Sequence, residues 1–115
     1  MPADCLFCKI IAGDIPSNKV YEDEDIFAFR DINPVAPQHI LLIPKKHISA
    51  VSEADRYDAA LLGHMMLQAS RLAEQTGMSR DGFRLVVNTG NNGGQTVFHL
   101  HLHLLGGRQM TWPPG

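Results

Sequence analysis

The stretch Phe98-His99-Leu100-His101-Leu102-His103-Leu104-Leu105 alternates apolar residues and imidazoles without interruption. This period of two is typical of a half-buried β-strand, in which one face meets the core and the other faces outward. The apolar members, beginning with Phe98, are predicted to pack inward, and the three histidines to share the opposite face. Successive residues on one face of a strand lie roughly 6.5–7 Å apart, so three imidazoles can address one small anionic group.

The three histidines have two other interpretations, an ordinary polar sheet face and a metal site. Histidine is tolerated as an ordinary polar residue on an exposed sheet face, but the chain has only six histidines, and three in regular alternation by accident is improbable. A metal site is the stronger alternative, because His-x-His pairs on strands bind zinc when a carboxylate or a further histidine completes the ligand set. The pattern alone leaves this alternative open.

The composition predicts a single domain over residues 1–115, long enough to bury most of its apolar surface without a disulfide framework. The formal net charge of −2 argues against a nucleic-acid groove built on bulk positive charge, while one nucleotide can still bind through local donors. Met1 to Asp4 lack the basic and apolar regions of a signal peptide, and no apolar run reaches the ~18 residues that span a bilayer. We therefore expect a cytoplasmic protein with no nucleic-acid or membrane partner.

Both cysteines lie in the short segment Cys5-Leu6-Phe7-Cys8. In a reducing compartment this C-x-x-C spacing is more often half of a metal site or a redox pair than a structural disulfide. No βαβ pattern surrounds it, which argues against a thioredoxin-like redox centre. Two small buried thiols without a metal remain the alternative.

Apolar runs and helix breakers predict the other elements of an α+β domain. A short helical turn over 7–12 is expected to end at Gly13, and His39–Pro44 is nearly continuously apolar, as in a strand buried on both faces. Further strands are predicted over 20–22, 26–30 and 83–89.

A long helix is predicted from Ser52 to about Gln75, with Gly77 as its C-terminal stop. Ser52 is interpreted as the N-cap, and Asp55 as the acid of a capping box. One stripe is predicted to face the core: Leu61, Leu62, Met65, Met66, Ala69, Leu72 and Ala73. The opposite face is predicted to be polar and solvated: His64, Gln68, Arg71 and Gln75.

Two loops carry candidate binding groups. The prolines of residues 31–37 restrict the backbone, so this loop can hold the Asp31 side chain still. A local turn cap, in which the Asp31 carboxylate accepts from nearby backbone amides, is an equally good interpretation. The segment Gly90–Val97 combines glycines with neutral donors, and beside the histidines it is typical of a phosphate-binding loop.

The tail Gly106–Gly115 is too polar and proline-rich for a strand. Its Trp112 is the only tryptophan in the chain. An indole near a terminus stays exposed unless it docks, and we expect Trp112 to dock onto a neighbouring subunit.

The segment His99–Leu105 resembles the H-φ-H-φ-H-φ-φ signature of the histidine triad (HIT) superfamily, where φ is an apolar residue. The similarity covers nearly the whole chain, including residues 7–11, 28–37, 43–49, 86–90 and 93–103. The tail over 106–115 is similar to that of the Hint branch, the histidine triad nucleotide-binding proteins, although Thr111 stands where a histidine is common. The resemblance implies a HIT-like fold with a five-stranded antiparallel sheet, one long and one short helix, and two protomers joined into a ten-stranded sheet.

The superfamily binds purine mononucleotides and hydrolyses bonds to the α-phosphate, notably in adenosine phosphoramidates. By resemblance, His101 is the nucleophile that forms a nucleotidyl-histidine, which water then resolves. His103 would donate to a phosphate oxygen, while Gly94, Gln95 and Thr96 would stabilise developing charge through backbone and hydroxyl donors.

The same resemblance implies the rest of the nucleotide pocket. Asn88 would hold the phosphate or sugar, Asp31 would accept from the ribose hydroxyls, and the Thr96 hydroxyl would donate to the leaving group. Trp112 would approach the partner's site and help to select the leaving group. The other pocket residues are apolar: Phe7, Ile10, Ile15, Phe29, Ile32 and Val97.

Cys5 and Cys8 depart from the animal Hint pattern. Many bacterial HIT proteins and the related galactose-1-phosphate uridylyltransferases hold zinc with a C-x-x-C and two histidines, which match His47 and His99 here. The resemblance therefore implies a structural Zn²⁺ bound by Cys5, Cys8, His47 and His99, a closed set with no open position for activated water. Zinc would brace the histidine strand, and the chemistry at His101 would require no cofactor.

The favoured function is a homodimeric hydrolase of nucleoside 5′-phosphoramidates, with acyl-adenylates as related substrates. One alternative is a nucleotide-binding regulatory or scaffold protein with little turnover, and another is a dinucleoside polyphosphate hydrolase. A metallohydrolase that uses the histidines as ligands is disfavoured, because the histidine strand lacks the nearby carboxylates that such sites recruit.

Overall fold

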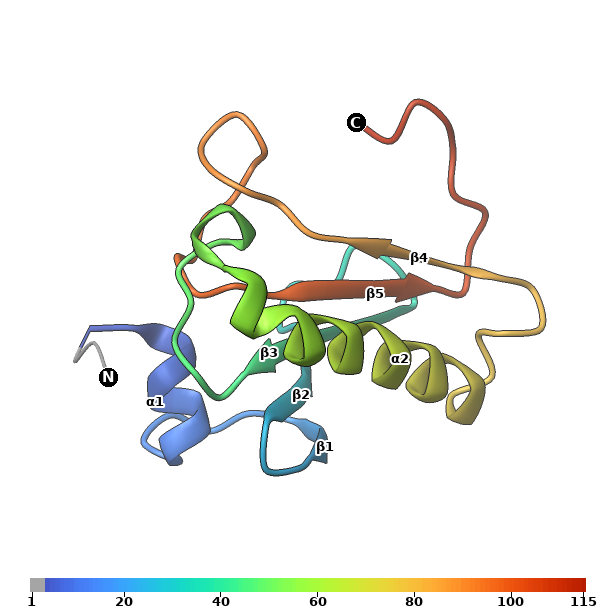
Figure 1. Ribbon diagram of the computed structural model, residues 1–115. Helices are drawn as coiled ribbons and strands as arrows, with labels where there is room; N and C mark the ends of the chain where they lie inside the picture. The colour runs from blue at the N-terminus through green and yellow to red at the C-terminus, as the bar shows by residue number, and fades with distance from the viewer. Residues whose placement is uncertain (1–3) are drawn as a thin grey trace.

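The computed structural model describes residues 4–115 (Figure 1). Residues 1–3, on which the expected absence of a signal peptide partly rests, lie outside the described part. One antiparallel sheet has the strand order β1-β2-β3-β5-β4. Its strands are β1 (Lys19–Glu22), β2 (Ile26–Arg30), β3 (Gln38–Pro44), β4 (Phe83–Val86) and β5 (Leu102–Gly106). The predicted five-stranded antiparallel sheet is confirmed.

The two faces of the sheet bury different apolar clusters. The long helix α2 (Ala59–Gln75) runs along one face, and the short helix α1 (Leu6–Ala12) lies against the other (Figure 1). Alternation along β2 separates the clusters, since Ala28 packs on the α2 side and Phe29 on the α1 side. Because Leu41 of the α1 side pairs directly with His103, the third histidine of the triad also faces the α1 side.

The short helix follows the prediction. It ends at Gly13, whose φ of 84° is left-handed and whose N–H donates to Ile10 O, as a glycine C-cap requires. At its other end, the Cys5 sulfur accepts from the backbone N–H of Cys8 at 3.4 Å. The N-cap position therefore fixes the spacing of the two thiols.

The long helix begins later than predicted, and Ser52 is not its N-cap. Two 3-10 turns, Val51–Glu53 and Arg56–Asp58, precede it. The capping box is formed by Asp55, which accepts from Tyr57 N–H, and Asp58, which accepts from Asp55 N–H. Each carboxylate accepts from a backbone amide only two or three residues away. Such local bonds favour tight turns over a continuous helix. The predicted end at Gln75 is confirmed.

The buried stripe of α2 is rotated from the prediction. Met65, Ala69 and Leu72 are buried as expected, but Met66 is 56% exposed and Gln68 is buried. Positions i, i+3 and i+7 from Met65 share one helical face, and that face passes through Gln68 rather than Met66. Within residues 4–115, no helix is long and apolar enough to cross a bilayer.

Only the second half of the histidine stretch is a strand. Phe98 is 51% exposed, so its predicted inward packing is wrong. Before Leu102 the chain leaves the ladder, because Leu100 N–H donates to Ile48 O and the His99 ring donates to Pro44 O. β4 likewise ends at Val86, three residues before its predicted end.

Candidate active site

A cavity of about 880 Å³ opens on the α1 face of the sheet. This volume falls within the range of small-molecule sites, about 300–1,000 Å³. The residues predicted for the nucleotide site that line it are Phe7, Ile10, Ile15, Phe29, Asp31, Ile32, Thr96, Val97, His101 and His103. The predicted residues outside its lining are Asn88, Gly94, Gln95 and Trp112.

The His101 ring is held in one tautomer. Its Nδ1 lies 2.7 Å from the backbone oxygen of His99, and a carbonyl oxygen only accepts, so Nδ1 carries the proton. The other nitrogen, Nε2, therefore presents a lone pair. Because His101 is otherwise buried and lines the cavity, this lone pair can act chemically as a nucleophile toward a ligand.

His103 is oriented by His39, a residue that the sequence analysis placed only in a buried strand. Val35 N–H donates to His39 Nδ1 at 3.2 Å, so the His39 proton is on Nε2. His39 Nε2 lies 2.9 Å from His103 Nδ1, which accepts that proton in a hydrogen bond. His103, which lines the cavity, consequently carries its own proton on Nε2. A histidine within the apolar run of a central strand was the available signal for this role.

The Nε2 atom of His103 is buried and has no hydrogen-bond partner among the described residues. Burial, with the neighbouring His101 and His39, lowers the pKa of His103 to about 4. The ring is therefore neutral at pH 7 and offers one unused N–H donor. A buried donor without a partner is costly, which favours a ligand acceptor at this position.

Asp31 shows both of the interactions considered for it. Its Oδ1 accepts from Asn33 N–H at 2.8 Å, which is the local turn cap. Its Oδ2 lies 3.4 Å from Nε2 of His39, the residue that hydrogen-bonds to His103. Because Asp31 also lines the cavity, its carboxylate lies where it can accept from a ligand.

The glycine-rich loop uses most of its own donors. Gly94 N–H donates to Asn91 O and Gln95 N–H donates to Gly90 O, so neither amide is free as the sequence analysis expected. The buried Gln95 side chain donates to Ser49 O and Val97 O and accepts from Gly90 N–H. These bonds close the loop and leave Thr96, which is exposed and lines the cavity, as its polar contribution.

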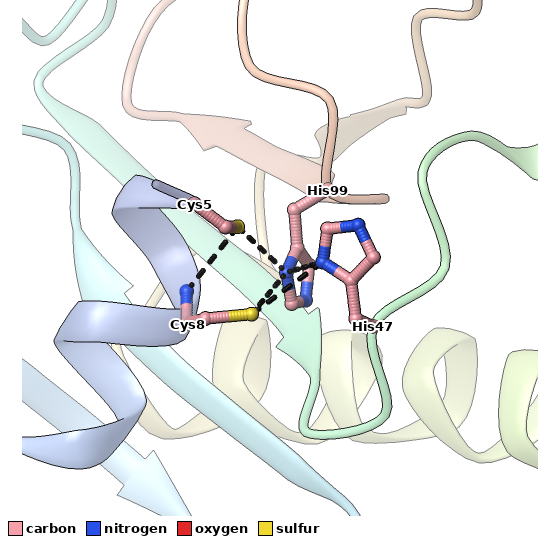
Figure 2. Close-up of side chains that lie close together, drawn as sticks. All are labelled: Cys5, Cys8, His47 and His99. Atoms are coloured by element: carbon pink, nitrogen blue, oxygen red, sulfur yellow. Dashed lines mark hydrogen bonds between the residues drawn. The ribbon is translucent and has the colours of Figure 1, made fainter. Parts of the chain in front are cut away.

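Four metal-ligating side chains converge beside the triad (Figure 2). Cys5 and Cys8 come from the start of α1, His47 from the loop after β3, and His99 from the segment before β5. His99 Nδ1 lies 3.4 Å from Cys5 Sγ, 3.6 Å from Cys8 Sγ and 3.2 Å from His47 Nδ1. The predicted ligand set is thus brought together.

The four donor atoms fit tetrahedral zinc. Bonds of about 2.3 Å to sulfur and 2.0–2.1 Å to nitrogen place the ligand atoms of such a site roughly 3.3–3.8 Å apart. His99 Nε2 donates to Pro44 O at 2.8 Å, which leaves the Nδ1 lone pair facing the thiols. Without a metal, burial and the contact with Cys5 raise the pKa of Cys8 to about 11.

The tail lies apart from the cavity of its own chain. Arg84 donates to Thr111 O, and Arg108 donates to Val35 O. Trp112 is 81% exposed, so it does not dock within its own chain.

Comparison with known protein families matches residues 12–110 to the HIT domain. The chain belongs to the HIT family. Two HIT-like proteins, from Synechocystis sp. and Synechococcus elongatus, are 55% and 53% identical to this HIT protein over 115 residues, the full length of all three chains. Both of these relatives are uncharacterized.

Solved structures of the family share the fold closely. A HIT family hydrolase from Legionella pneumophila superposes with a TM-score of 0.96 at 55% identity, covering 97% of this chain and 100% of the other. A histidine triad protein from Clostridium difficile superposes with a TM-score of 0.93 at 43% identity, covering 96% of both chains. The HIT-like fold inferred from the triad signature is confirmed.

Proposed function

We propose that this HIT protein is a Hint-like hydrolase that cleaves the P–N bond of purine nucleoside 5′-phosphoramidates through a covalent nucleotidyl-histidine. One observation carries the proposal. The His101 Nε2 lone pair and the unpartnered His103 Nε2–H stand side by side at one cavity, with ring centroids 5.0 Å apart. A nucleophile next to a donor suits attack on a phosphoryl group. The name "HIT family hydrolase" of the Legionella relative supports the reaction class.

The reaction would proceed in two displacements. His101 Nε2 bonds to phosphorus while the P–N bond breaks, and the amine leaves with a proton for which the Thr96 hydroxyl is the proposed donor. His103 Nε2–H donates to a non-bridging oxygen and stabilises its developing charge. Water then attacks phosphorus and gives a proton back to the Thr96 oxygen, the bond to His101 breaks, and the nucleoside monophosphate leaves.

The remainder of the cavity would bind the nucleoside. Apolar side chains from α1, β2 and the two adjoining loops form a slot suited to a purine ring: Phe7, Ile10, Ile15, Phe29 and Ile32. The Asp31 carboxylate would accept from the ribose hydroxyls. In a homodimer, Trp112 of one chain would approach the leaving-group side of the partner's cavity.

Cys5, Cys8, His47 and His99 would hold one structural zinc ion, whose closed ligand set supplies rigidity rather than an activated water. This ligand set joins α1 to the segment that carries His101. His99 belongs to both parts, because its ring faces the thiols and its carbonyl orients His101. The zinc ligands would thus help to position the nucleophile.

Hydrolysis of an adenosine 5′-phosphoramidate tests the function. We expect His101→Ala to lose more than about 10³-fold in kcat, as for removal of a covalent nucleophile, and His64→Ala, a histidine outside the cavity, to keep it. Mass spectrometry of quenched wild-type reactions should find the nucleotide on His101.

Full activity of folded His101→Ala would overturn the mechanism. Nucleotide binding without turnover would favour the regulatory function, and faster cleavage of a dinucleoside polyphosphate would favour that hydrolase class.

Metal analysis tests the zinc proposal. We expect one zinc per purified chain, less zinc in Cys8→Ser, and a lower thermal unfolding midpoint after chelation, because binding to the folded state stabilises it. Folded protein after chelation should retain turnover. Activity that disappears while circular dichroism is unchanged would instead favour a metallohydrolase, and metal-free protein of unchanged stability would contradict a structural ion.

A further inference from the structure

We propose, on the basis of the function above, that the cavity selects nucleosides whose whole 5′-phosphate chain carries one net negative charge, such as phosphoramidates and diesters, over the doubly charged monophosphate and over polyphosphates, whose chains carry more. This selection would let the site hold its substrate and release its nucleoside monophosphate product. It would also favour the phosphoramidate reaction over cleavage of dinucleoside polyphosphates.

The first argument is the scarcity of positive charge around the cavity. Of the described residues that line it, Arg30 is the only lysine or arginine. Its guanidinium donates to Gln38 Oε1 at 2.8 Å. Alternation along β2 places the Arg30 side chain with Ala28 on the α2 side of the sheet, opposite the face of Phe29 and the histidines. No lysine or arginine head is therefore assigned to the phosphate end.

The second argument is the charge that the cavity does contain. The titratable groups at the histidine end are His101 and His103, His39 of β3, and Asp31 beyond β2. His103 Nδ1 accepts from neutral His39, whose Nε2 also lies 3.4 Å from the Asp31 carboxylate. A negative charge therefore already lies behind His39, the residue that hydrogen-bonds to the donor to the phosphate. One further charge on the ligand is tolerated through neutral donors, and a second would meet this carboxylate uncompensated.

A proton must then accompany the monophosphate. A phosphate monoester loses its second proton near pH 6. Above that pH, the product binds either by taking a proton back or by placing one on His103, and both routes give the same overall charge. In either case the apparent affinity for adenosine monophosphate falls as the pH rises, by up to about tenfold per pH unit when one proton is taken up.

Adenosine 5′-methylphosphonate is the matched control ligand, because a methyl group replaces one oxygen and the charge stays at minus one. Calorimetry of both ligands with the wild-type protein from pH 5 to 8 tests the proposal. We expect the Kd of adenosine monophosphate to rise at least tenfold from pH 6 to 8 and that of the methylphosphonate to change less than threefold. Titrations in buffers of different ionisation enthalpy should show nearly one proton taken up per monophosphate at pH 8.

Two outcomes would overturn the proposal and separate it from the proposed function. Monophosphate that binds as tightly at pH 8 as at pH 6, without proton uptake, removes the charge selection but leaves a nucleotide site. Adenosine diphosphate that binds more tightly than the methylphosphonate at pH 8 does the same. Failure of both adenosine ligands to bind at any pH would reject the nucleotide function and this inference together.

Discussion

At the scale of single residues, three backbone groups determine the protonation pattern of four histidines, the two that line the cavity and the two that contact or precede them. The carbonyls of Pro44 and His99 accept from His99 and His101, and the Val35 N–H donates to His39. Each bond admits only one tautomer, because a carbonyl cannot donate and an N–H cannot accept. The backbone thus gives His101 a lone pair and His103 a proton at the cavity.

His39 should affect catalysis without contacting the reacting atoms. We expect His39→Leu to lower kcat about 10–100-fold, the usual effect of removing a partner that orients an active-site group. His39→Gln retains an N–H donor for His103 Nδ1 and should recover part of the loss. The ¹⁵N shifts of His103 should report loss of the Nε2–H tautomer in the leucine variant. Unchanged kcat together with unchanged shifts would show that His103 is oriented by something else.

The sequence patterns identified the side chains proposed to react or to bind a metal, but they missed a side chain that orients one of them. His101 and His103 stood out through alternation, and Cys5 and Cys8 through their spacing. His39 did not, because its role depends on the register between β3 and β5, which no local pattern encodes. The free amides expected of Gly94 and Gln95 were wrong for a similar reason, since the loop closes on its own carbonyls.

At the scale of elements, the glycine-rich loop is packed against its own start. A Cβ added at Gly93 would overlap the Thr89 carbonyl oxygen, whereas one added at Gly63 in α2 would meet nothing within 4 Å. We expect Gly93→Ala to destabilise the fold by about 1–3 kcal/mol through overpacking. Gly63→Ala should stabilise it by about 0.5–1 kcal/mol through helix propensity. Urea unfolding measures both, and a neutral Gly93→Ala would mean that the loop can move away from Thr89.

Asp23 ties the β1–β2 turn to α2. Burial raises the pKa of its carboxyl, but hydrogen bonds from Asp25 N–H, His64, Ile26 N–H and Tyr21 outweigh burial and lower it overall. A lowered pKa in the folded state means that folding releases a proton below about pH 4, the unfolded value. The stabilisation is therefore complete above that pH and is lost as the pH falls.

An Asp23→Asn variant tests this link. The difference in unfolding free energy between wild type and Asp23→Asn should be largest near neutral pH and should shrink steadily below about pH 4. Asp25→Asn, at a carboxylate that makes no side-chain hydrogen bond in the described structure, is the matched control and should show little change. A difference that grows on acidification would contradict the sign of the argument.

At the scale of the whole molecule, apolar patterns predicted the strands and both helices, and the resemblance to the HIT superfamily implied how the strands join into one antiparallel sheet. The apolar patterns failed where polar side chains decide the local path. Asp55 and Asp58 stabilise 3-10 turns where the first turns of the helix were predicted. Hydrogen bonds of the His99 ring and the Leu100 amide keep this segment from pairing as part of β5. Both departures lie at capping or site residues, where hydrogen bonds compete with regular structure.

The predicted ten-stranded sheet requires an edge strand that can pair with the same strand of a second chain. β4 is an edge strand, so one side of its backbone is unpaired within the chain. On α2, two apolar side chains are exposed, Met66 at 56% and Leu67 at 62%. Two β4 edges paired about a two-fold axis would extend the sheet and bring the two α2 helices together. Trp112, exposed in the single chain, would then be free to reach the partner.

We therefore predict a dimer of the wild-type chain at micromolar concentration, measured by sedimentation equilibrium. Leu67→Glu should weaken it by about 2 kcal/mol, close to 30-fold in Kd, because a charge would be buried in the interface. Tyr57→Glu introduces the same charge at a side chain that is 77% exposed, in a 3-10 turn outside α2, and should leave the dimer intact. A monomeric wild type would reject the ten-stranded sheet. Equal weakening by both variants would place the interface on the face that includes Tyr57 rather than at β4. In that case the dimer would not bring Trp112 to the second cavity as proposed.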